Sequence, residues 1–328
     1  MGFLKGLIRK ATGGGEVSRR RETLVDEREA MPDAELSESD CRYRETAHHG
    51  SLPAPCAIAV DPIQGLVAVG NKSGVVKVIG REGVERLLRA EIAAPVSCLA
   101  FAPGLGIVCA GTDAPAIYIW DLTVEGGKRN WRCIPLRAFP TCLHCPSGAP
   151  FLYAGTSEGD LLFAHLPSGD LAAYAVSPAE LGCNAPAARS VVSCEALSSS
   201  SLLLLVALRE GLITLWDMEK RRSKPLLGGG IGLAAARPSP DARLAAAGYT
   251  SGEVLVWLLA QERAPILRLS PGIACCVRAL SWGAMLDPGA DKGKEKGAGV
   301  SGVSLVILEA ADAYAPGRLV VLYTLCPL

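Results

Sequence analysis

The sequence has no excess of charge of either sign and no long apolar run. Its 328 residues carry 33 Lys and Arg against 33 Asp and Glu, so the formal net charge at pH 7 is zero. This balance gives no sign of the strongly basic face that is typical of nucleic-acid binders. The longest apolar candidate, Ser201–Leu208, is far shorter than the roughly 18 to 20 residues that span a bilayer, so we expect no membrane crossing.

Residues for catalysis and metal binding are also scarce. Of the four histidines, neither His48 and His49 nor His144 and His165 have the i, i+4 spacing of a zinc-protease helix. "CLHC" at Cys142–Cys145 is a lone C-x-x-C, and on a strand these two thiols would point to opposite faces, while a zinc site needs two more ligands. No G-x-x-x-x-G-K-[ST] phosphate loop occurs. We predict no catalytic residue, no metal and no cofactor.

What the sequence does have is apolar residues and cysteine. Hydrophobic residues make up 49% of the chain and charged residues 20%, which is enough for a substantial core. The 12 cysteines are scattered, several within apolar runs such as "GIVCAG" and "GIACCV", and the chain starts without a secretory signal. These features favour reduced, mostly buried thiols in a cytoplasmic protein.

Residues 1–50 differ in composition from residues 51–328. In "MGFLKGLIRKA" the apolar residues fall on one side of a short helix, with Lys5, Arg9 and Lys10 on its flanks. Such a helix suits a peripheral contact of residues 1–11 with a membrane, and docking on the body or fraying are equally open. The rest of this head has the composition of a disordered segment.

From residue 51 onward the sequence is repetitive. Short runs of Val, Leu, Ile and Ala alternate with Gly, Pro, Asp and Ser, which predicts many short strands joined by tight turns. Five segments align, and their starts are 41, 44, 52 and 41 residues apart. They are "GNKSGVVKVIG" from Gly70, "GTDAPAIYIWD" from Gly111, "GTSEGDLLFAH" from Gly155, "ALREGLITLWD" from Ala207 and "GYTSGEVLVWL" from Gly248.

The period is close to the roughly 40 to 45 residues of a four-stranded propeller blade. A tryptophan stands at the same offset in three repeats, and two of them continue with aspartate as the WD dipeptide. These positions are Trp120, Asp121, Trp216, Asp217 and Trp257. Before each aligned turn lies another apolar run that can form the innermost strand of its blade. The sequence therefore predicts an all-β fold, a WD-repeat β-propeller.

A sixth blade is predicted from three apolar runs near the end of the chain. They are "CCVRALSW" at Cys275–Trp282, "VSLVILEA" at Val303–Ala310 and "GRLVVLYTL" at Gly317–Leu325. About six four-stranded blades can thus be recognised, one fewer than the common seven. Either the ring closes with six blades, or it is an incomplete seven-bladed ring.

One stretch, "GTSEG" at Gly155–Gly159, fits the G-x-S-x-G pattern of a serine nucleophile on a strand-to-helix turn. The residues that follow Ser157 read as a strand, "DLLFAHL", so we predict a hairpin turn in the third blade. Turn geometry that favours positive φ would explain the glycines that begin and end these turns. The equivalent residues are Gly70, Gly111 and Gly248 at the start, and Gly74, Gly211 and Gly252 at the end.

The first repeat, from His48 to Glu85, is similar to the opening blade of the lethal giant larvae and tomosyn family. That family typically shows His-Gly, Asp-Pro-x-Gln, an Ala-x-Gly turn and Gly-x-Pro-Gly-Val-Glu, and this sequence departs from it at Glu82, where the family has Pro. The matching positions, which we expect to be structural, are His49, Gly50, Asp61, Pro62, Gln64, Gly70, Gly74, Gly80, Gly83, Val84 and Glu85.

The resemblance implies a noncatalytic scaffold in the cytoplasm or peripheral at the plasma membrane. Its implied partners are syntaxin-type SNAREs, and in some members Rab GTPases or myosin, in exocytosis and cell polarity. Family members usually have a second propeller, and tomosyns a SNARE-like coiled coil, whereas no sustained heptad occurs in these 328 residues. The chain would then be a fragment, a truncated gene model or a shortened member. The alternative is a WD-repeat adaptor in an unrelated complex, and a hydrolase ranks third.

Overall fold

The computed structural model describes residues 50–81, 84–124, 131–183, 189–197, 200–226, 230–260, 264–270, 276–286, 300–310 and 318–325. For residues 200–201, 284–286, 300–310 and 318–325 only the backbone is described. Residues 49–328 form one compact unit. The helix and disordered segment expected in the N-terminal head fall outside the described residues.

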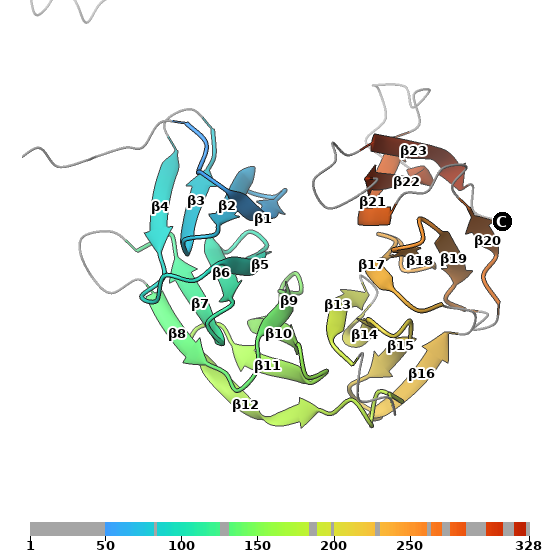
Figure 1. The fold of residues 1–328 in the computed structure, drawn as a ribbon, viewed down its shortest axis with the longest axis horizontal. Helices are drawn as coiled ribbons and strands as arrows, with labels where there is room; N and C mark the ends of the chain where they lie inside the picture. The colour runs from blue at the N-terminus through green and yellow to red at the C-terminus, as the bar shows by residue number, and fades with distance from the viewer. Residues whose placement is uncertain are drawn as a thin grey trace, which may run out of the picture. The chain divides into compact units, whose positions relative to one another are not determined.

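The described residues form 23 strands in six antiparallel sheets (Figure 1). The first three sheets are β1 (Pro55–Asp61), β2 (Leu66–Asn71), β3 (Val75–Ile79) and β4 (Glu85–Arg89); β5 (Val96–Ala102), β6 (Ile107–Thr112), β7 (Ala116–Asp121) and β8 (Trp131–Pro135); and β9 (Pro140–His144), β10 (Phe151–Thr156), β11 (Leu161–His165) and β12 (Asp170–Val176).

The other three sheets continue in chain order, and the sixth has three described strands. They are β13 (Val191–Leu197), β14 (Ser200–Leu208), β15 (Ile213–Asp217) and β16 (Arg222–Leu226); β17 (Leu233–Pro238), β18 (Leu244–Tyr249), β19 (Val254–Leu258) and β20 (Leu267–Leu269); and β21 (Cys276–Leu286), β22 (Val300–Ala310) and β23 (Arg318–Leu325). The all-β class is confirmed, each aligned segment falls in its own sheet, and the three apolar runs predicted for the sixth blade are strands.

The sheets follow one another as propeller blades through their first strands. β1 contacts β5, β5 contacts β9, β9 contacts β13, β13 contacts β17, and β17 contacts β21. This order confirms that the apolar run before each aligned turn is the innermost strand of its blade. The ring is not closed: in the described part of the chain β21 and β1 lack contacts as extensive as those between the other consecutive innermost strands, and Figure 1 shows them apart.

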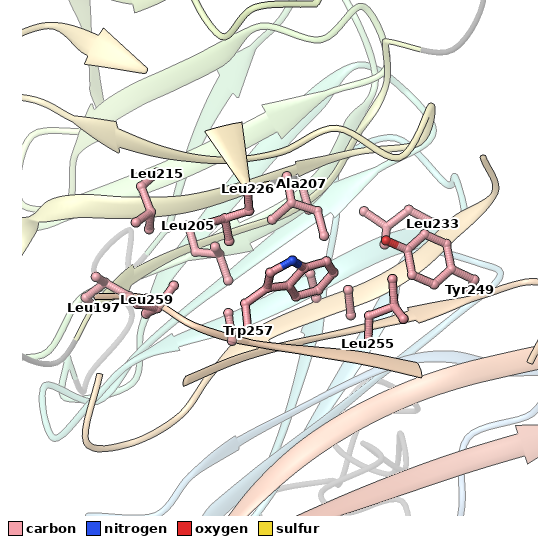
Figure 2. Close-up of a cluster of buried hydrophobic side chains, with 14 residues drawn as sticks. Leu197, Leu205, Ala207, Leu215, Leu226, Leu233, Tyr249, Leu255, Trp257 and Leu259 are labelled. Carbon is pink, nitrogen blue, oxygen red and sulfur yellow. The ribbon is translucent and has the colours of Figure 1, made fainter. Parts of the chain in front are cut away.

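The core consists of apolar layers between consecutive sheets. Figure 2 shows the layer between the fourth and fifth sheets, where Trp257 lies among leucines of both. Trp120 occupies the layer between the first and second sheets, and Trp216 the layer between the third and fourth. Each of these tryptophans thus packs toward the preceding blade. A sheet that lies between two other sheets buries both of its faces, so its strands carry apolar residues on both faces.

The glycines of the aligned turns have two different causes. Gly74, Gly159, Gly211 and Gly252, which end the turns, have φ between 79° and 99°, as the turn geometry predicts. The explanation offered for the first glycines was wrong, because Gly70, Gly111, Gly155 and Gly248 lie inside strands and their φ is not positive. A Cβ on Gly248 would lie 2.4 Å from Val277, and one on Gly70 would lie 2.7 Å from Val96. These glycines are needed because the first strand of the next blade approaches their backbone.

Candidate interaction site

The serine of "GTSEG" lies in a hairpin turn. The turn joins β10 to β11 and closes with hydrogen bonds from the N–H of Gly159 to the carbonyl of Thr156 and from the N–H of Asp160 to Oγ1 of Thr156. The N–H of Ser157 donates to the carbonyl of Phe139 at 2.9 Å. A strand follows Ser157, and a nucleophile elbow needs a helix there, so the hairpin prediction is confirmed.

The two thiols of "CLHC" point to different layers, as strand alternation predicts. Sγ of Cys142 lies 3.5 Å from Sγ of Cys194 on β13, toward the fourth sheet. Cys145 is buried together with Cys109 in the layer toward the second sheet. Among the described residues no group of three or more His, Cys, Asp or Glu is arranged to hold a metal ion.

The histidine between these thiols, His144, is poorly suited to proton transfer near neutral pH. Burial, and then the nearby charge of Arg237, lowers its pKa to about 4. Its Nε2 is buried and makes no hydrogen bond to another described group. His144 is therefore a neutral packing residue at pH 7.

Two signature residues of the first blade satisfy a buried ammonium. Nζ of Lys77 lies 2.7 Å from the carbonyl oxygen of Gly50 and 2.7 Å from Oε1 of Glu85, and Lys77 is 2% exposed. A buried cation is costly unless it is paired and hydrogen-bonded. Gly50 and Glu85, from the first and last parts of the signature, therefore both bind Lys77, which does not belong to the signature.

Asp61 of the signature joins the first blade to the second. It is completely buried, and its Oδ1 accepts hydrogen bonds from the N–H of Ile63 at 2.9 Å and of Gln64 at 3.4 Å. Its Oδ2 accepts from the N–H of Gly104, in the turn after β5, at 2.9 Å. The Asp-Pro-x-Gln turn is thereby fixed against the neighbouring blade, while Pro62 and Gln64 are exposed.

The other signature residues shape the turns of the first sheet. The N–H of Gly80 donates to the carbonyl of Val84 at 2.8 Å, and a Cβ on Gly80 would lie 2.9 Å from both Leu66 and Val84. Val84 is exposed, and His49 and Gly83 lie outside the described residues. We propose a structural role for the whole signature.

The aspartates of the WD dipeptides organise the turn after the third strand. Oδ1 of Asp121 accepts hydrogen bonds from the N–H and the hydroxyl of Thr123 at 2.9 and 2.6 Å. Oδ1 of Asp217 accepts from the N–H of Glu219 and of Lys220 at 3.0 and 2.9 Å, and the bond from the Lys220 backbone is the main cause that lowers the pKa of Asp217. The partner tryptophans are each at most 2% exposed.

A row of side-chain hydrogen bonds between the innermost strands was not predicted from the sequence. Cys56 donates to the carbonyl of Val96 at 3.1 Å, Ser97 to that of Pro140 at 2.8 Å, and Thr141 to that of Val191 at 2.6 Å. Each donor directly precedes the residue that pairs with the first glycine of its aligned segment, so the three positions are equivalent. The sequence did contain a signal for these hydrogen bonds, because a small polar residue occurs at the same position of the innermost strand in three repeats.

These strands line a central cavity of about 350 Å³, to which all six innermost strands contribute. Ser97, Thr141 and Ser193 face it with hydroxyls that already donate to the neighbouring strand. Arg237 also lines it and forms an ion pair with Glu195. Most of the described polar groups of this cavity therefore form hydrogen bonds or ion pairs between or within the innermost strands. A second cavity lies between the third and fourth sheets.

Comparison with known proteins identifies relatives of this propeller, although no protein-family model matches the chain. It is 27% identical over 201 residues to Lethal(2) giant larvae protein of Drosophila pseudoobscura pseudoobscura, covering 54% of this chain and 16% of that protein. It is 33% identical over 85 residues to Lethal(2) giant larvae protein homolog 1 of Rattus norvegicus, covering 26% of this chain and 8% of that protein.

A human relative, LLGL scribble cell polarity complex component 2, is 26% identical over 139 residues, which are 39% of this chain and 14% of that protein. The chain is therefore similar to lethal giant larvae proteins, the resemblance that the first repeat predicts. The matched part spans between 8% and 16% of the length of these relatives. In the described part of the chain, no helix has the length and hydrophobicity needed to cross a membrane.

Proposed function

We propose that this protein is a noncatalytic scaffold that acts through protein partners in cell polarity and exocytosis. The observation that carries the proposal is the 201-residue match to lethal giant larvae protein, in a chain whose blades form a propeller. One human relative is named as a component of a cell polarity complex. The loops of a rigid β scaffold are suited to recognition, which supports a binding role.

The partners we propose first are syntaxin-type SNAREs, followed by Rab GTPases and myosin. We further propose that the protein is cytoplasmic and reaches the plasma membrane peripherally, with residues 1–11 as a membrane contact. The apolar and basic residues of that segment support the contact.

The test is a pulldown of the full chain with immobilised syntaxin-type SNAREs and with Rab GTPases loaded with GDP or a GTP analogue. We expect retention by at least one of these partners. Circular dichroism and a cooperative thermal transition establish that the protein used is folded. A folded chain that none of them retains would contradict the SNARE and GTPase assignment, and cross-linking mass spectrometry that instead recovers an unrelated complex would support the adaptor alternative.

A further inference from the structure

A cavity of about 530 Å³ lies between the third and fourth sheets, within the size range of ligand pockets. We call it the aromatic pocket. One wall comes from β10, β11 and β12, and Leu202 of β14 and Met218 after β15 close the other side. The side chains that define it here are Phe151, Tyr153, Phe163, Tyr174, Leu202 and Met218.

The aromatic wall is an ordered array. Phe163 stacks on Tyr174 with ring centroids 5.5 Å apart and an interplanar angle of 17°. Tyr153 meets Phe163 edge to face at 5.3 Å, and Phe151 meets His165 in the same way at 5.8 Å. Rings held by one another lose little freedom when a ligand binds, so the wall is pre-formed.

The rim of the aromatic pocket is apolar and exposed. Phe151, Leu171 and Leu202 are 43%, 40% and 47% exposed and come from two different sheets. Large apolar side chains that gather around a concavity are typical of interaction sites, whereas scattered ones are ordinary.

A basic segment adjoins the same pocket. Lys220 and Arg221 are exposed in the turn that begins with Met218, which lines the pocket, and Arg222 is exposed at the start of β16. The guanidinium of Arg221 lies 4.8 Å from the centre of the Tyr174 ring. Arg221 also has φ of 52°, a left-handed conformation that is uncommon for a bulky residue and is often found at functional sites. The contact with Tyr174 thus holds Arg221 beside the aromatic wall of the pocket.

The opposite end of the pocket wall is acidic. Asp170 begins β12 and lines the pocket, four residues before Tyr174. A ligand that lies along β12 would therefore have an apolar centre, an acidic group near Arg221 and a basic or donor group near Asp170.

We propose that the aromatic pocket binds a short peptide segment whose Leu or aromatic anchor lies between acidic residues and a basic or donor group. The apolar rim receives the anchor, and Lys220 to Arg222 attract the acidic residues. This inference goes beyond the proposed function and does not depend on it, since it assigns a recognition chemistry to a surface rather than a named partner.

The test begins with selection of a random heptapeptide display library on the full chain. We expect enrichment of peptides with Leu, Phe, Tyr or Trp next to Asp or Glu. Fluorescence polarisation of a selected peptide should then show that Leu202→Asp or Arg221→Glu weakens binding at least about tenfold. Phe151→Ser serves as the second pocket variant if Leu202→Asp does not fold.

Matched controls lie on the first sheet. Leu87 is 36% exposed and Arg86 is exposed on β4, so Leu87→Asp and Arg86→Glu make the same chemical changes away from the pocket and should leave binding unchanged. The proposal is overturned by three results: enrichment without acidic residues, binding that the pocket variants do not weaken, or selective binding of phosphatidylserine vesicles that the same variants abolish while no peptide is enriched.

Discussion

The first and fifth sheets have similar apolar strands but different surroundings. In the fifth sheet, Ala245, Ala247 and Trp257 pack against the fourth sheet, while alternate residues such as Ala246 and Val256 pack against the sixth. Both faces are therefore buried, and Figure 2 shows one of the two layers.

Among the described residues, such a layer covers only one face of the first sheet. Val76 and Val78 are buried against the second sheet, whereas Ile58 and Val60 on the other face are 68% and 57% exposed. The ion pair of Lys77 and Glu85 also lies on this second face, by strand alternation from Val76 and Val78. An apolar strand pattern provides a surface that a neighbouring blade can cover. Whether that surface is buried depends on the presence of the neighbouring blade.

The largest effect is expected from truncation in the enclosed sheet. Trp257→Ala removes a side chain that is 1% exposed and leaves a cavity between two sheets, so the free energy of unfolding should fall by about 3 to 5 kcal/mol. Ile58→Ala on the open face of the first sheet should cost less than about 0.5 kcal/mol. Urea denaturation measures both changes. Similar losses would contradict the difference in burial between the fifth sheet and the open face of the first sheet.

A smaller effect is expected from the charged pair of the first sheet. Glu85→Gln leaves the Lys77 ammonium without its carboxylate, and the free energy of unfolding should fall by about 2 to 3 kcal/mol, less than for a fully buried pair because Glu85 is 26% exposed. The double variant Lys77→Met with Glu85→Leu should recover most of the loss in the same urea experiment. A single variant as stable as the original protein would show that the pair is solvated like a surface salt bridge.

His144 in the enclosed third sheet should make the stability of the protein depend on pH. The pKa of His144 is about 4 in the folded protein and 6.5 as its ordinary value, so protons bind preferentially to the unfolded chain. The stabilisation is complete above pH 6.5 and is lost as the pH falls toward 4, which amounts to at most roughly 2 kcal/mol between pH 7 and pH 5.

Thermal melts at pH 7 and pH 5 measure this difference. In His144→Gln the part of this pH dependence that is due to His144 should disappear. If both proteins lose the same stability between the two pH values, the imidazole titrates as an ordinary surface histidine.

A further effect concerns the contact from the first sheet to the second. Asp61→Ala removes the acceptor for the N–H groups of Ile63 and Gly104, and the free energy of unfolding should fall by about 1 to 3 kcal/mol. Amide hydrogen exchange should accelerate in the turn at Gly104, whereas Asp121→Ala should affect its own turn at Thr123. Unchanged exchange at Gly104 would mean that the two turns are held together by other contacts.

The amino-acid pattern was sufficient to predict the repeat, and with it the strands, the hairpin turns and the innermost strand of each blade. These follow from local rules: alternation of apolar residues, and glycines at positive φ such as Gly74 and Gly159. The same rules separated Cys142 from Cys145 and placed Ser157 in a turn. Because one short motif is weak, the five aligned repeats were needed for that conclusion.

The side-chain contacts between neighbouring blades could be identified only from the tertiary structure. Gly248 is a glycine because Val277, 29 positions later, approaches its backbone, and Cys142 meets Cys194 from the next blade. The aromatic pocket likewise depends on Leu202 and Tyr174 coming from adjacent sheets. Such contacts depend on how consecutive sheets are packed, which no local pattern encodes, so the sequence determined the blades and the packing determined the surfaces between them.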